Sequence, residues 1–565
     1  MSRNDVASPN GLTGQETNPS LANPESSRVE RFAEQVLRGP LVWFLGLVAF
    51  LQLATWIPHY LTWPYWADHD VHATLARAWD RGLLPYRDMR CNNFPGSIYL
   101  FWILGKVAGW GKTLPFYAFD AGLVVALGVA LATWSQRKLG GLLPGLVGYL
   151  TYLSYYLALD YPVTGQKDWH GPFLAVLGLL IAELWPGRAG RTFSALALAL
   201  AVVFRPQAVL FLPAALFAID ESTRAAGEPI SKTVRAGLEW GITFALLLLI
   251  GFMPLLLAGV VPDFLESLRF VSYGGRYNTV TLWSLFPNWF AQIAPMRVMI
   301  IPLAFLLLGR MSGLASRRTA LTWFVALAGG SLYKPISPYP HVYLAIPMML
   351  IWSVNVTVLT HLVMAARPML PSIRLVAVLM ILAVGVTVRP LFCVVTKSLE
   401  AVAMIKSGGI PEAIPSGYRG GTVPTAAYYP WSDYRALLMY LRDKTTPDTK
   451  VANVLRWDPA VLAAVDRPSA FPAEAITWLR MVNPDDEHRF AESLRDSGAN
   501  SVVVWIPGEV GPYPPLPLDE IQGIIREQYQ PETRFGNIEV WRRKGAPKIE
   551  TTVRSQQSGP SQGPG

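Results

Sequence analysis

The chain has 565 residues, of which 52% are hydrophobic and 15% charged, and its formal net charge is +9. This composition excludes an ordinary soluble protein and indicates a polytopic membrane protein. The basic residues are spread through short loops between apolar segments, so they favour a role in membrane topology over nucleic-acid binding. The two cysteines, Cys91 and Cys393, form no metal-binding pattern and predict no disulfide framework.

The N-terminal part of the chain divides into a polar tail and a long series of apolar segments. Residues 1–40 are rich in Asn, Ser and Gly, and we interpret them as a disordered cytoplasmic tail instead of a cleavable signal peptide. Residues 41–395 carry the apolar segments, which predict about 11 to 13 transmembrane helices. The candidates are 41–60, 97–112, 116–134, 142–158, 171–186, 192–204, 207–219, 238–260, 288–308, 320–333, 341–360 and 373–395.

Lys and Arg favour cytoplasmic loops, which gives a topology. The tail and the basic loops should be inside, whereas the loops 61–96, 161–170, 261–287 and 334–340 and everything after residue 395 should face outward. Two outward loops need an even number of crossings between them, but three candidates lie between Pro95 and Asp168. We expect 142–158 to re-enter, because Pro144 and two glycines would break a straight helix, or a further short crossing to be present. The basic loops contain Arg188 and Arg191; Arg224, Lys232 and Arg235; Arg310, Arg317 and Arg318; and Arg367 and Arg374.

The loop 61–96 carries many charged residues between two apolar segments. Asp70 followed by "VHATLARAWDRG" predicts a helix that is capped by Asp70, ends at Gly82 and lies along the outer interface. Such a helix would hold Asp68 at the mouth of a cavity between the membrane helices. A carboxylate in that place can act as a general base or bind a metal ion. The alternatives are a solvated acid at Asp68 and a simple helix cap at Asp70.

Beyond about residue 400 the composition changes. The stretch "YPWSDYRALLMYLRDKTTPDTKVANVL" is typical of an amphipathic helix followed by a strand, and "SGANSVVVWIPGEV" of a buried strand. We therefore predict a small extracytoplasmic α/β domain over residues 396–545 and a disordered tail over 546–565. The expected fold is an α-helical polytopic membrane protein with this domain at its C-terminal end.

The first outward loop resembles that of the C-type glycosyltransferases (GT-C), in particular bacterial members related to protein O-mannosyltransferases and lipid A aminoarabinose transferases. The resemblance rests on an acid, an Ala-rich helix and the pattern "G..PYRD......PG..YL". His69 stands where the family usually has Glu, so the participation of a divalent metal is left open. The matching residues are Asp68, Ala76, Gly82, Pro85, Tyr86, Arg87, Asp88, Pro95 and Gly96.

Other segments are also similar to this family. The run "KPISPYPHVYLAIPMML" resembles a late outer loop, "GQKDWHG" resembles a second acidic outer loop with Asp168 just before a membrane helix, and "AVVFRPQAVLF" places Arg205 between two apolar half-helices. The bland alternatives are a helix cap at Asp168, a snorkelling lysine at Lys334 and an interfacial histidine at His341. Outside the resemblance, the loop after the Gly274 and Gly275 pair is suited to contact a substrate.

The resemblance implies a sugar donor linked to polyprenyl phosphate, whose phosphate needs cationic partners. Asp68 is then the expected general base, with Asp70 or Asp168 as a possible second acid. Expected phosphate ligands are Arg87, Lys334, His341 and Arg205. Expected substrate contacts are Tyr86, Asp88, Arg276, Tyr277, Tyr339 and Tyr343.

The expected function is transfer of a sugar, with inversion, from that donor to a hydroxyl of a lipid, glycan or protein acceptor outside a bacterial plasma membrane. No phosphate-binding GxxxxGK[ST] motif is present in the sequence, which argues against an ATP-driven pump or a nucleotide-sugar enzyme. Two other readings stay open: a transporter or flippase of lipid-linked saccharides, and a non-catalytic membrane scaffold whose outer domain binds a partner.

Overall fold

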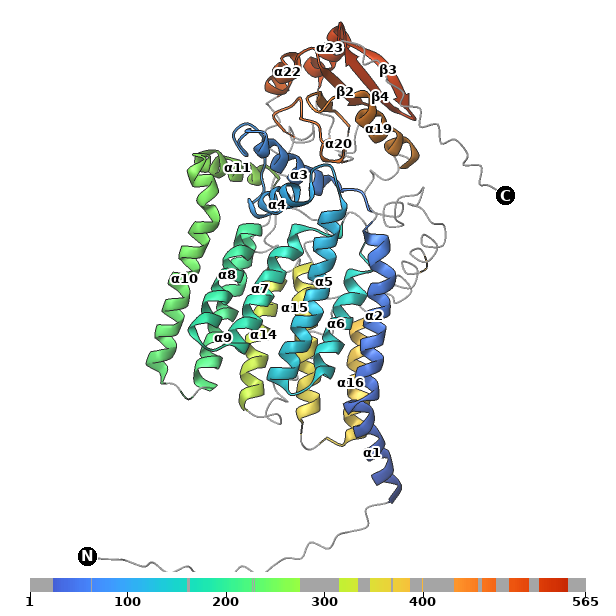
Figure 1. Cartoon of the computed structure of the whole chain (residues 1–565). Coiled ribbons are helices and arrows are strands. Elements are labelled where there is room, and N and C mark those ends of the chain that lie inside the picture. The colour runs from blue at the N-terminus through green and yellow to red at the C-terminus, as the bar shows by residue number, and fades with distance from the viewer. Residues whose placement is uncertain are drawn as a thin grey trace, which may run out of the picture.

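A bundle of long helices forms the body of the protein, and a small α/β unit sits at one end of it (Figure 1). We call that end of the bundle the upper end. The computed structural model describes residues 24–61, 63–159, 163–225, 227, 229–274, 314–333, 346–366, 369–386, 399, 431–455, 460–473, 487–507 and 518–546. The bundle contains α2 (Pro40–Tyr60), α5 (Leu114–Trp134), α6 (Leu142–Tyr156), α7 (Lys167–Leu184), α8 (Arg188–Phe204), α9 (Leu212–Ala225), α10 (Ile230–Leu257), α14 (Leu314–Leu332), α15 (Ile346–Ala365) and α16 (Pro371–Val386).

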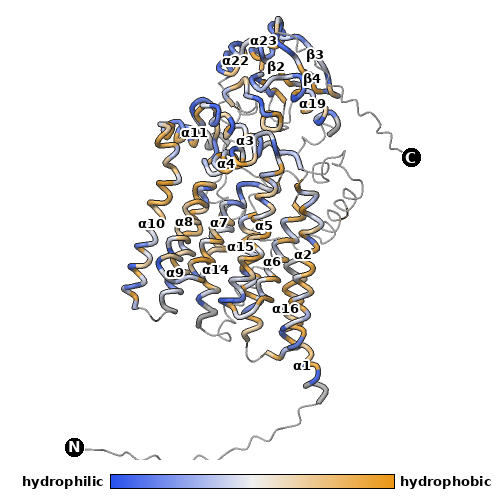
Figure 2. Tube along the Cα trace, in the orientation of Figure 1, coloured by the Kyte–Doolittle hydropathy of each residue, from blue (hydrophilic) through white to orange (hydrophobic). Residues whose placement is uncertain are grey.

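The exposed side chains of the bundle are those of a membrane protein. Leu238, Ile242, Leu246 and Ile250 recur every four residues along α10, and each is more than half exposed. Such an apolar stripe is unfavourable in water but favourable in lipid, and Figure 2 shows apolar residues along most of the bundle. Among the described residues, four helical segments have the length and hydropathy to cross a membrane: 28–58, 114–139, 230–257 and 346–365. The predicted crossing 288–308 lies outside the described residues.

Three shorter helices lie between the bundle and the α/β unit: α3 (Ala67–Asp80), α4 (Gly96–Ala108) and α11 (Val261–Gly274). The prediction that 142–158 re-enters is wrong, because α6 runs through the bundle while α4 lies beside α3 at the upper end (Figure 1). The glycines of α6 permit close packing instead of breaking the helix: a Cβ on Gly145 would lie 2.7 Å from the carbonyl oxygen of Leu131. Two helices of the bundle, α5 and α6, therefore separate the first loop from the start of α7.

The lower end of the bundle carries the connections α7–α8, α9–α10 and α15–α16. The beginnings of the adjoining helices hold basic residues that we expected to be cytoplasmic: Arg188 and Arg191 in α8, Lys232 and Arg235 in α10, and Arg374 in α16. Helix α1 (Pro24–Arg38) is at this end too, although we expected residues 1–40 to be disordered. It is ordered because its buried Ala33 and Leu37 pack inward and because Glu30 accepts hydrogen bonds from the Ser372 amide and hydroxyl, at 2.8 and 2.6 Å.

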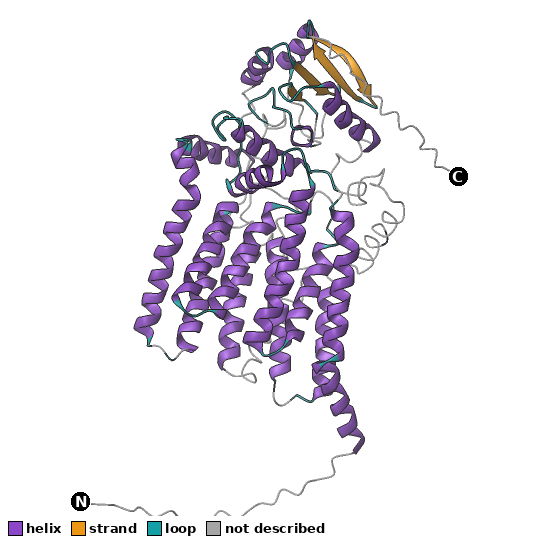
Figure 3. Ribbon diagram, viewed as in Figure 1, coloured by secondary structure: helices purple, strands orange, loops and turns teal. Residues whose placement is uncertain are grey.

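The C-terminal unit, seen in Figure 3 as the only described region with strands, is built on a four-stranded sheet of order β1-β2-β4-β3. Strand β1 (Lys450–Asn453) is parallel to β2 (Ser501–Trp505), whereas β4 (Ile538–Arg543) is antiparallel to β2 and to β3 (Tyr529–Phe535). The predicted helix, strand and buried strand are confirmed as α19, β1 and β2. The helices of the unit are α19 (Trp431–Lys444), α20 (Leu462–Val465), α22 (Glu487–Arg495) and α23 (Asp519–Gln528).

Helix α3 begins earlier than the sequence indicates. Trp66 is its N-cap residue, so Asp70 lies within the first turn and does not cap the helix. The expected stop is confirmed, because Arg81 is the C-cap and Gly82 adopts a φ of +93°, a conformation that glycine adopts at little cost. The side chain of Asp70 points instead to the C-terminal unit, as described below.

The upper end of the bundle is held together by the buried carboxylate of Asp120, on the second turn of α5. Tyr60 of α2 and Tyr156 of α6 donate to one carboxylate oxygen at 2.7 and 2.8 Å. Trp169 Nε1 and His170 Nε2 of α7 lie 2.7 and 2.6 Å from the other. Four partners compensate the cost of burying this carboxylate, and they join four helices at one point.

His69 of α3 fixes the short segment that leads into α7. Its Nε2 lies 3.1 Å from the Gly165 carbonyl oxygen, and its Nδ1 accepts from the Trp66 amide at 3.4 Å, an arrangement that suits the neutral Nε2–H tautomer. Burial lowers the pKa of His69 to about 4. Gly165 is required there, because its φ is +73° and a Cβ would lie 2.9 Å from the Tyr60 hydroxyl.

We predict that Asp120→Ala destabilises the protein by about 3–5 kcal/mol, because it leaves several buried donors without an acceptor. The measurement is the free energy of unfolding in detergent. The matched control is Tyr149→Phe, which removes one hydroxyl bonded to the Val124 carbonyl at 3.0 Å and should cost about 1 kcal/mol. Equal losses in the two variants would contradict the central role of Asp120.

The burial of His69 predicts a pH dependence of stability. The unfolded chain protonates this histidine near its ordinary pKa, about 6.5, whereas the folded protein does so only near 4. Stability is therefore complete above pH 6.5 and falls as the pH decreases toward 4, by up to about 3 kcal/mol from this residue. Thermal unfolding of wild type and His69→Gln across this range tests it: the variant should show the shallower decrease, and equal slopes would refute it.

Candidate functional site

Asp68 and His72 lie on one face of α3, because residues four apart are neighbours on a helix. This face points to the first turn of α7, where Lys167 Nζ lies 3.2 Å from His72 Nε2. Asp68 lies within electrostatic reach of the Lys167 ammonium. Asp68 is partly exposed, whereas His72 and Lys167 are buried. A partly exposed carboxylate therefore stands beside a buried cation.

An ion pair between Asp168 and Arg205 lies beside these residues. The carboxylate of Asp168, next to Lys167, lies 2.6 Å from the Arg205 guanidinium, and the side chain of Asp168 is fully buried. Arg205 is in an extended conformation between α8 and the 3-10 helix η3 (Pro206–Phe211), with φ −150° and ψ 118°. Pro206 disfavours helical geometry in the residue before it, which explains the break. The expected position of Arg205 between two apolar helical segments is confirmed.

Two glycines bring these elements close together. A Cβ on Gly96, at the start of α4, would lie 2.7 Å from Phe204 Cα at the end of α8. A Cβ on Gly171 would lie 3.1 Å from the Ala201 carbonyl oxygen and 3.4 Å from Arg205 Cβ. The Pro95-Gly96 pair therefore ends the first loop against α8, beside Arg205.

The group around Asp68 consists of Asp68, His72, Lys167, Asp168 and Arg205. Its charges balance, because it holds two carboxylates, Asp68 and Asp168, and two cations, Lys167 and Arg205. His72 adds no charge, because burial and then the positive Lys167 hold its pKa well below the ordinary value. It stays neutral and can accept a hydrogen bond from Lys167. Asp168 is paired with Arg205, whereas the Asp68 carboxylate makes no hydrogen bond to any residue that the structure describes. Asp68 is thus the acid best placed to take a proton.

The "PYRD" residues of the first loop have other partners. Arg87 lies 3.0 Å from the Asp263 carboxylate of α11, and Asp88 accepts from the Leu84 amide at 2.7 Å. Tyr86 has a φ of +71°, is 1% exposed and donates its hydroxyl to the Asn93 carbonyl at 2.9 Å. The prediction that Tyr86 contacts substrate does not fit this burial, because its side chain serves to hold the loop. Arg87 is directed to α11 and is not part of the group around Asp68.

Six predicted residues lie outside the described part of the chain: Lys334, His341, Arg276, Tyr277, Tyr339 and Tyr343. Tyr333, the last described residue before one of these segments, is fully buried and lies close to Asp168 and Arg205. Within the described ranges, no group of three or more His, Cys, Asp or Glu side chains is arranged to hold a metal ion. The participation of a divalent metal therefore stays an open part of the prediction.

Sequence reasoning did not identify Lys167, His72 or Asp120. Lys167 had a signal, since it directly precedes Asp168 at the start of a membrane helix, where a cation is costly without a partner. His72 follows Asp68 by one helical turn, which was visible in the sequence. Asp120 also had a signal, since an acid within an apolar segment is costly without partners, but the sequence does not reveal which helices supply its donors.

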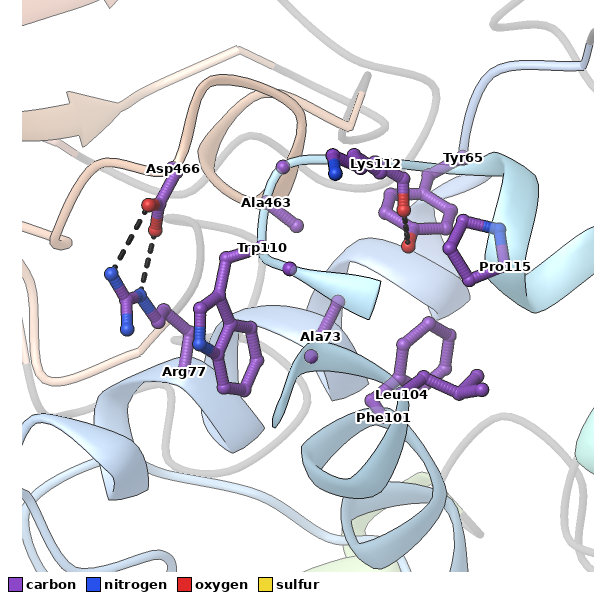
Figure 4. Close-up of a pocket in the computed structure, with 13 residues that line it drawn as sticks. Tyr65, Ala73, Arg77, Phe101, Leu104, Trp110, Lys112, Pro115, Ala463 and Asp466 are labelled. Atoms are coloured by element: carbon purple, nitrogen blue, oxygen red, sulfur yellow. Dashed lines mark hydrogen bonds and ion pairs between the residues drawn. The ribbon is translucent and has the colours of Figure 1, made fainter. Parts of the chain in front are cut away.

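A separate pocket lies on another side of α3, between α3, the α4–α5 connection and residues 463–466 (Figure 4). Arg77 stacks over the Trp110 ring at 4.9 Å and pairs with Asp466, and the Tyr65 hydroxyl donates to the Lys112 carbonyl oxygen at 2.7 Å. The pocket is lined by neither Asp68 nor Lys167, so it is distinct from the group described above.

No protein-family model and no curated protein sequence matches this chain. Among solved structures, the chain is similar to ArnT from Cupriavidus metallidurans bound to undecaprenyl phosphate, with 12% identity, a TM-score of 0.54, and coverage of 89% of this chain and 98% of that one. The apo structure of the same protein gives 13% identity and a TM-score of 0.49 over 89% and 97%. At this identity the similarity to the undecaprenyl-phosphate complex establishes the fold alone. The expected fold is thereby confirmed: the chain has the GT-C fold of a polytopic helical membrane protein.

Proposed function

We propose that this protein is a membrane glycosyltransferase that transfers a sugar from a polyprenyl-phosphate donor to an acceptor hydroxyl, with Asp68 as the general base. The observation that carries the proposal is a partly exposed carboxylate, Asp68, within electrostatic reach of Lys167 at the upper end of the bundle. The next residue on α7, Asp168, pairs with a second cation, Arg205. The similarity of fold to ArnT, whose structure contains undecaprenyl phosphate, supports the choice of donor class.

The proposed reaction uses each of these groups. Asp68 removes the proton of the acceptor hydroxyl, whose oxygen attacks the anomeric carbon from the face opposite the phosphate. The bond between that carbon and the phosphate oxygen breaks, and polyprenyl phosphate leaves with inversion at the sugar. The phosphate gains one negative charge in this step, and Lys167 and Arg205 can stabilise that charge. Since phosphate leaves readily, no strong general acid is required.

The hydrogen bond to His72 gives Lys167 a defined direction. Neutral His72 can accept one of the three Lys167 protons, which leaves the other two for phosphate oxygens. Arg205 is held through Asp168 in the same way. Both cations are therefore oriented before the donor binds, so less side-chain entropy is lost on binding.

The other parts of the molecule bind the rest of the substrates and set the orientation in the membrane. The prenyl chain lies against apolar helices, and the C-terminal unit with the neighbouring loops selects a lipid, glycan or protein acceptor. The basic lower end faces the cytoplasm of a bacterial cell, and the upper end with the C-terminal unit faces outward. This orientation is supported by the basic residues at the lower helix connections.

Asp68→Asn should lower the turnover number about 100- to 10,000-fold, because a general base contributes that much to rate, while the thermal stability stays close to wild type. The measurement is transfer of labelled sugar from a polyprenyl-phosphate donor by the protein in liposomes. Asp519→Asn, an exposed first-turn acid of α23, is the control and should retain activity. Wild-type turnover by Asp68→Asn would rule out the base assignment.

Lys167→Gln should weaken binding of polyprenyl phosphate about 10- to 100-fold, since a charge-assisted hydrogen bond contributes about 1.5–3 kcal/mol. Binding is measured with the purified protein and the unglycosylated lipid phosphate, so the result does not depend on the acceptor. The control is Lys106→Gln, a half-exposed lysine at the upper end that pairs with Asp80. Equal affinity of Lys167→Gln and wild type would remove Lys167 from the phosphate site.

A further inference from the structure

Helix α3 has a second face, which docks the C-terminal unit. Asp70, Arg77 and Arg81 share it, because spacings of seven and four residues return to the same side of a helix. Asp68 is two residues from Asp70, so the two side chains point to opposite sides. One face of the helix thus meets Lys167 of the group around Asp68. The other face meets the segment 460–473 of the C-terminal unit, which we call the docking segment.

Asp70 makes the most buried contact of this interface. Its side chain is fully buried, and its two carboxylate oxygens accept hydrogen bonds from the backbone amides of Val461, at 3.1 Å, and Ala463, at 2.7 Å. These amides are at the start of α20, where helix N–H groups lack partners within the helix. A carboxylate that accepts two such bonds is a strong, directional link. Asp70 therefore joins the first turn of α3 to α20.

A second contact lies further along the same face. Asp466, directly after α20, accepts hydrogen bonds from Arg77 Nε and a terminal Arg77 nitrogen at 2.8 and 3.1 Å (Figure 4). Arg81 donates to the Asp466 carbonyl oxygen at 3.1 Å. Asp466 has a φ of +52°, a left-handed conformation that costs an ordinary residue about 1 kcal/mol. Arg77 and Arg81 contact Asp466 and can stabilise this backbone conformation. The backbone conformation of the docking segment therefore matches its contacts with α3.

The backbone of the first loop also takes part. The Arg90 amide donates to the Pro472 carbonyl oxygen at 2.7 Å, which attaches the end of the docking segment to the part of the loop that follows α3. The segment 460–473 therefore contacts the first loop both along α3 and after it.

From these contacts we infer that the C-terminal unit is part of the catalytic apparatus: through Asp70 it fixes the first turn of α3 and so positions Asp68 against the donor. The inference rests on the proposed function, in which Asp68 is the base. Asp70 is then a positioning residue. Its burial, its two backbone donors and its orientation away from Asp68 exclude the second-acid role that the sequence suggested.

The expected effect follows from the sensitivity of catalysis to geometry. Because Asp68 and Asp70 belong to the same helical turn, loss of the Asp70 link permits the turn to rotate or shift. A displacement of about 1 Å at a reacting group can reduce the rate about 100-fold. Donor binding should change little, because His72, which holds Lys167, lies in the second turn of α3 and Arg205 is held by Asp168. The later part of α3 also stays attached to Asp466 through Arg77 and Arg81.

The experiment removes the link from each side. Asp70→Asn replaces one acceptor oxygen with an amide group, and Ala463→Pro deletes the donor of the 2.7 Å bond at a first-turn position where proline is tolerated. Each variant should lower kcat at least about 10-fold with an unchanged KM for the donor. Since both variants weaken the same link between Asp70 and α20, the double variant should lose little more than the singles. Asp519→Asn, an exposed first-turn acid of α23, is the control and should behave as wild type.

Hydrogen exchange provides a readout that needs no activity. The amides of His69 and Asp70 donate to the Trp66 carbonyl oxygen at 2.9 and 3.0 Å, so exchange in this turn reports its order. It should accelerate in Asp70→Asn and in Ala463→Pro but not in Asp519→Asn. Unchanged exchange in both variants, wild-type kcat, additive losses, or a loss confined to the donor KM would each overturn the inference. If wild type transfers no sugar although exchange accelerates as expected, the proposed function fails while the link between Asp70 and α20 stands.

Discussion

The Asp120 carboxylate is the constraint on which the upper end of this protein depends. It is buried where α2, α5, α6 and α7 meet, and it persists there because hydroxyl, indole and imidazole groups from the other three helices surround it. Its two partners on α7, Trp169 and His170, directly follow Lys167 and Asp168. The four-helix junction therefore fixes the position and rotation of the first turn of α7, which carries Lys167 and Asp168.

The two histidines of α3, His69 and His72, act as fixed, neutral hydrogen-bonding groups. Burial keeps the pKa of His69 near 4 and that of His72 well below its ordinary value. Positive charge in the group around Asp68 is thus confined to Lys167 and Arg205, which suits an anionic ligand. The departure at His69, where related loops have an acid, has a structural reason in this chain: the imidazole holds Gly165 and the approach to α7.

Much of the architecture could be predicted from the sequence, because apolar segments, basic loops and strand-like patterns depend on local composition. The same holds for Arg205, where Pro206 breaks the helix, and for the position of Asp68 on an upper-end loop. The roles of α4 and α6 could not be predicted, since both are apolar and contain glycine. What separates them is tertiary contact: Gly145 packs on α5, whereas Gly96 packs on the end of α8. A sequence pattern identifies a face of a helix but not the partner that covers it.

The charged residues of α3 lie on two different faces of the helix, which explains why their roles were hard to predict from the sequence. Asp68 and Asp70 are the same type of residue and only two positions apart, yet a helix directs them to opposite sides, one toward α7 and the other toward α20. An acid among buried backbone amides gains strength as a structural link but loses access to a substrate, whereas a partly exposed acid near a cation keeps that access. One side chain cannot both form a buried link and keep access to a substrate. In the first turn of α3, Asp70 forms the link and Asp68 keeps the access. The stable interface at Asp70 then supports the geometry at Asp68.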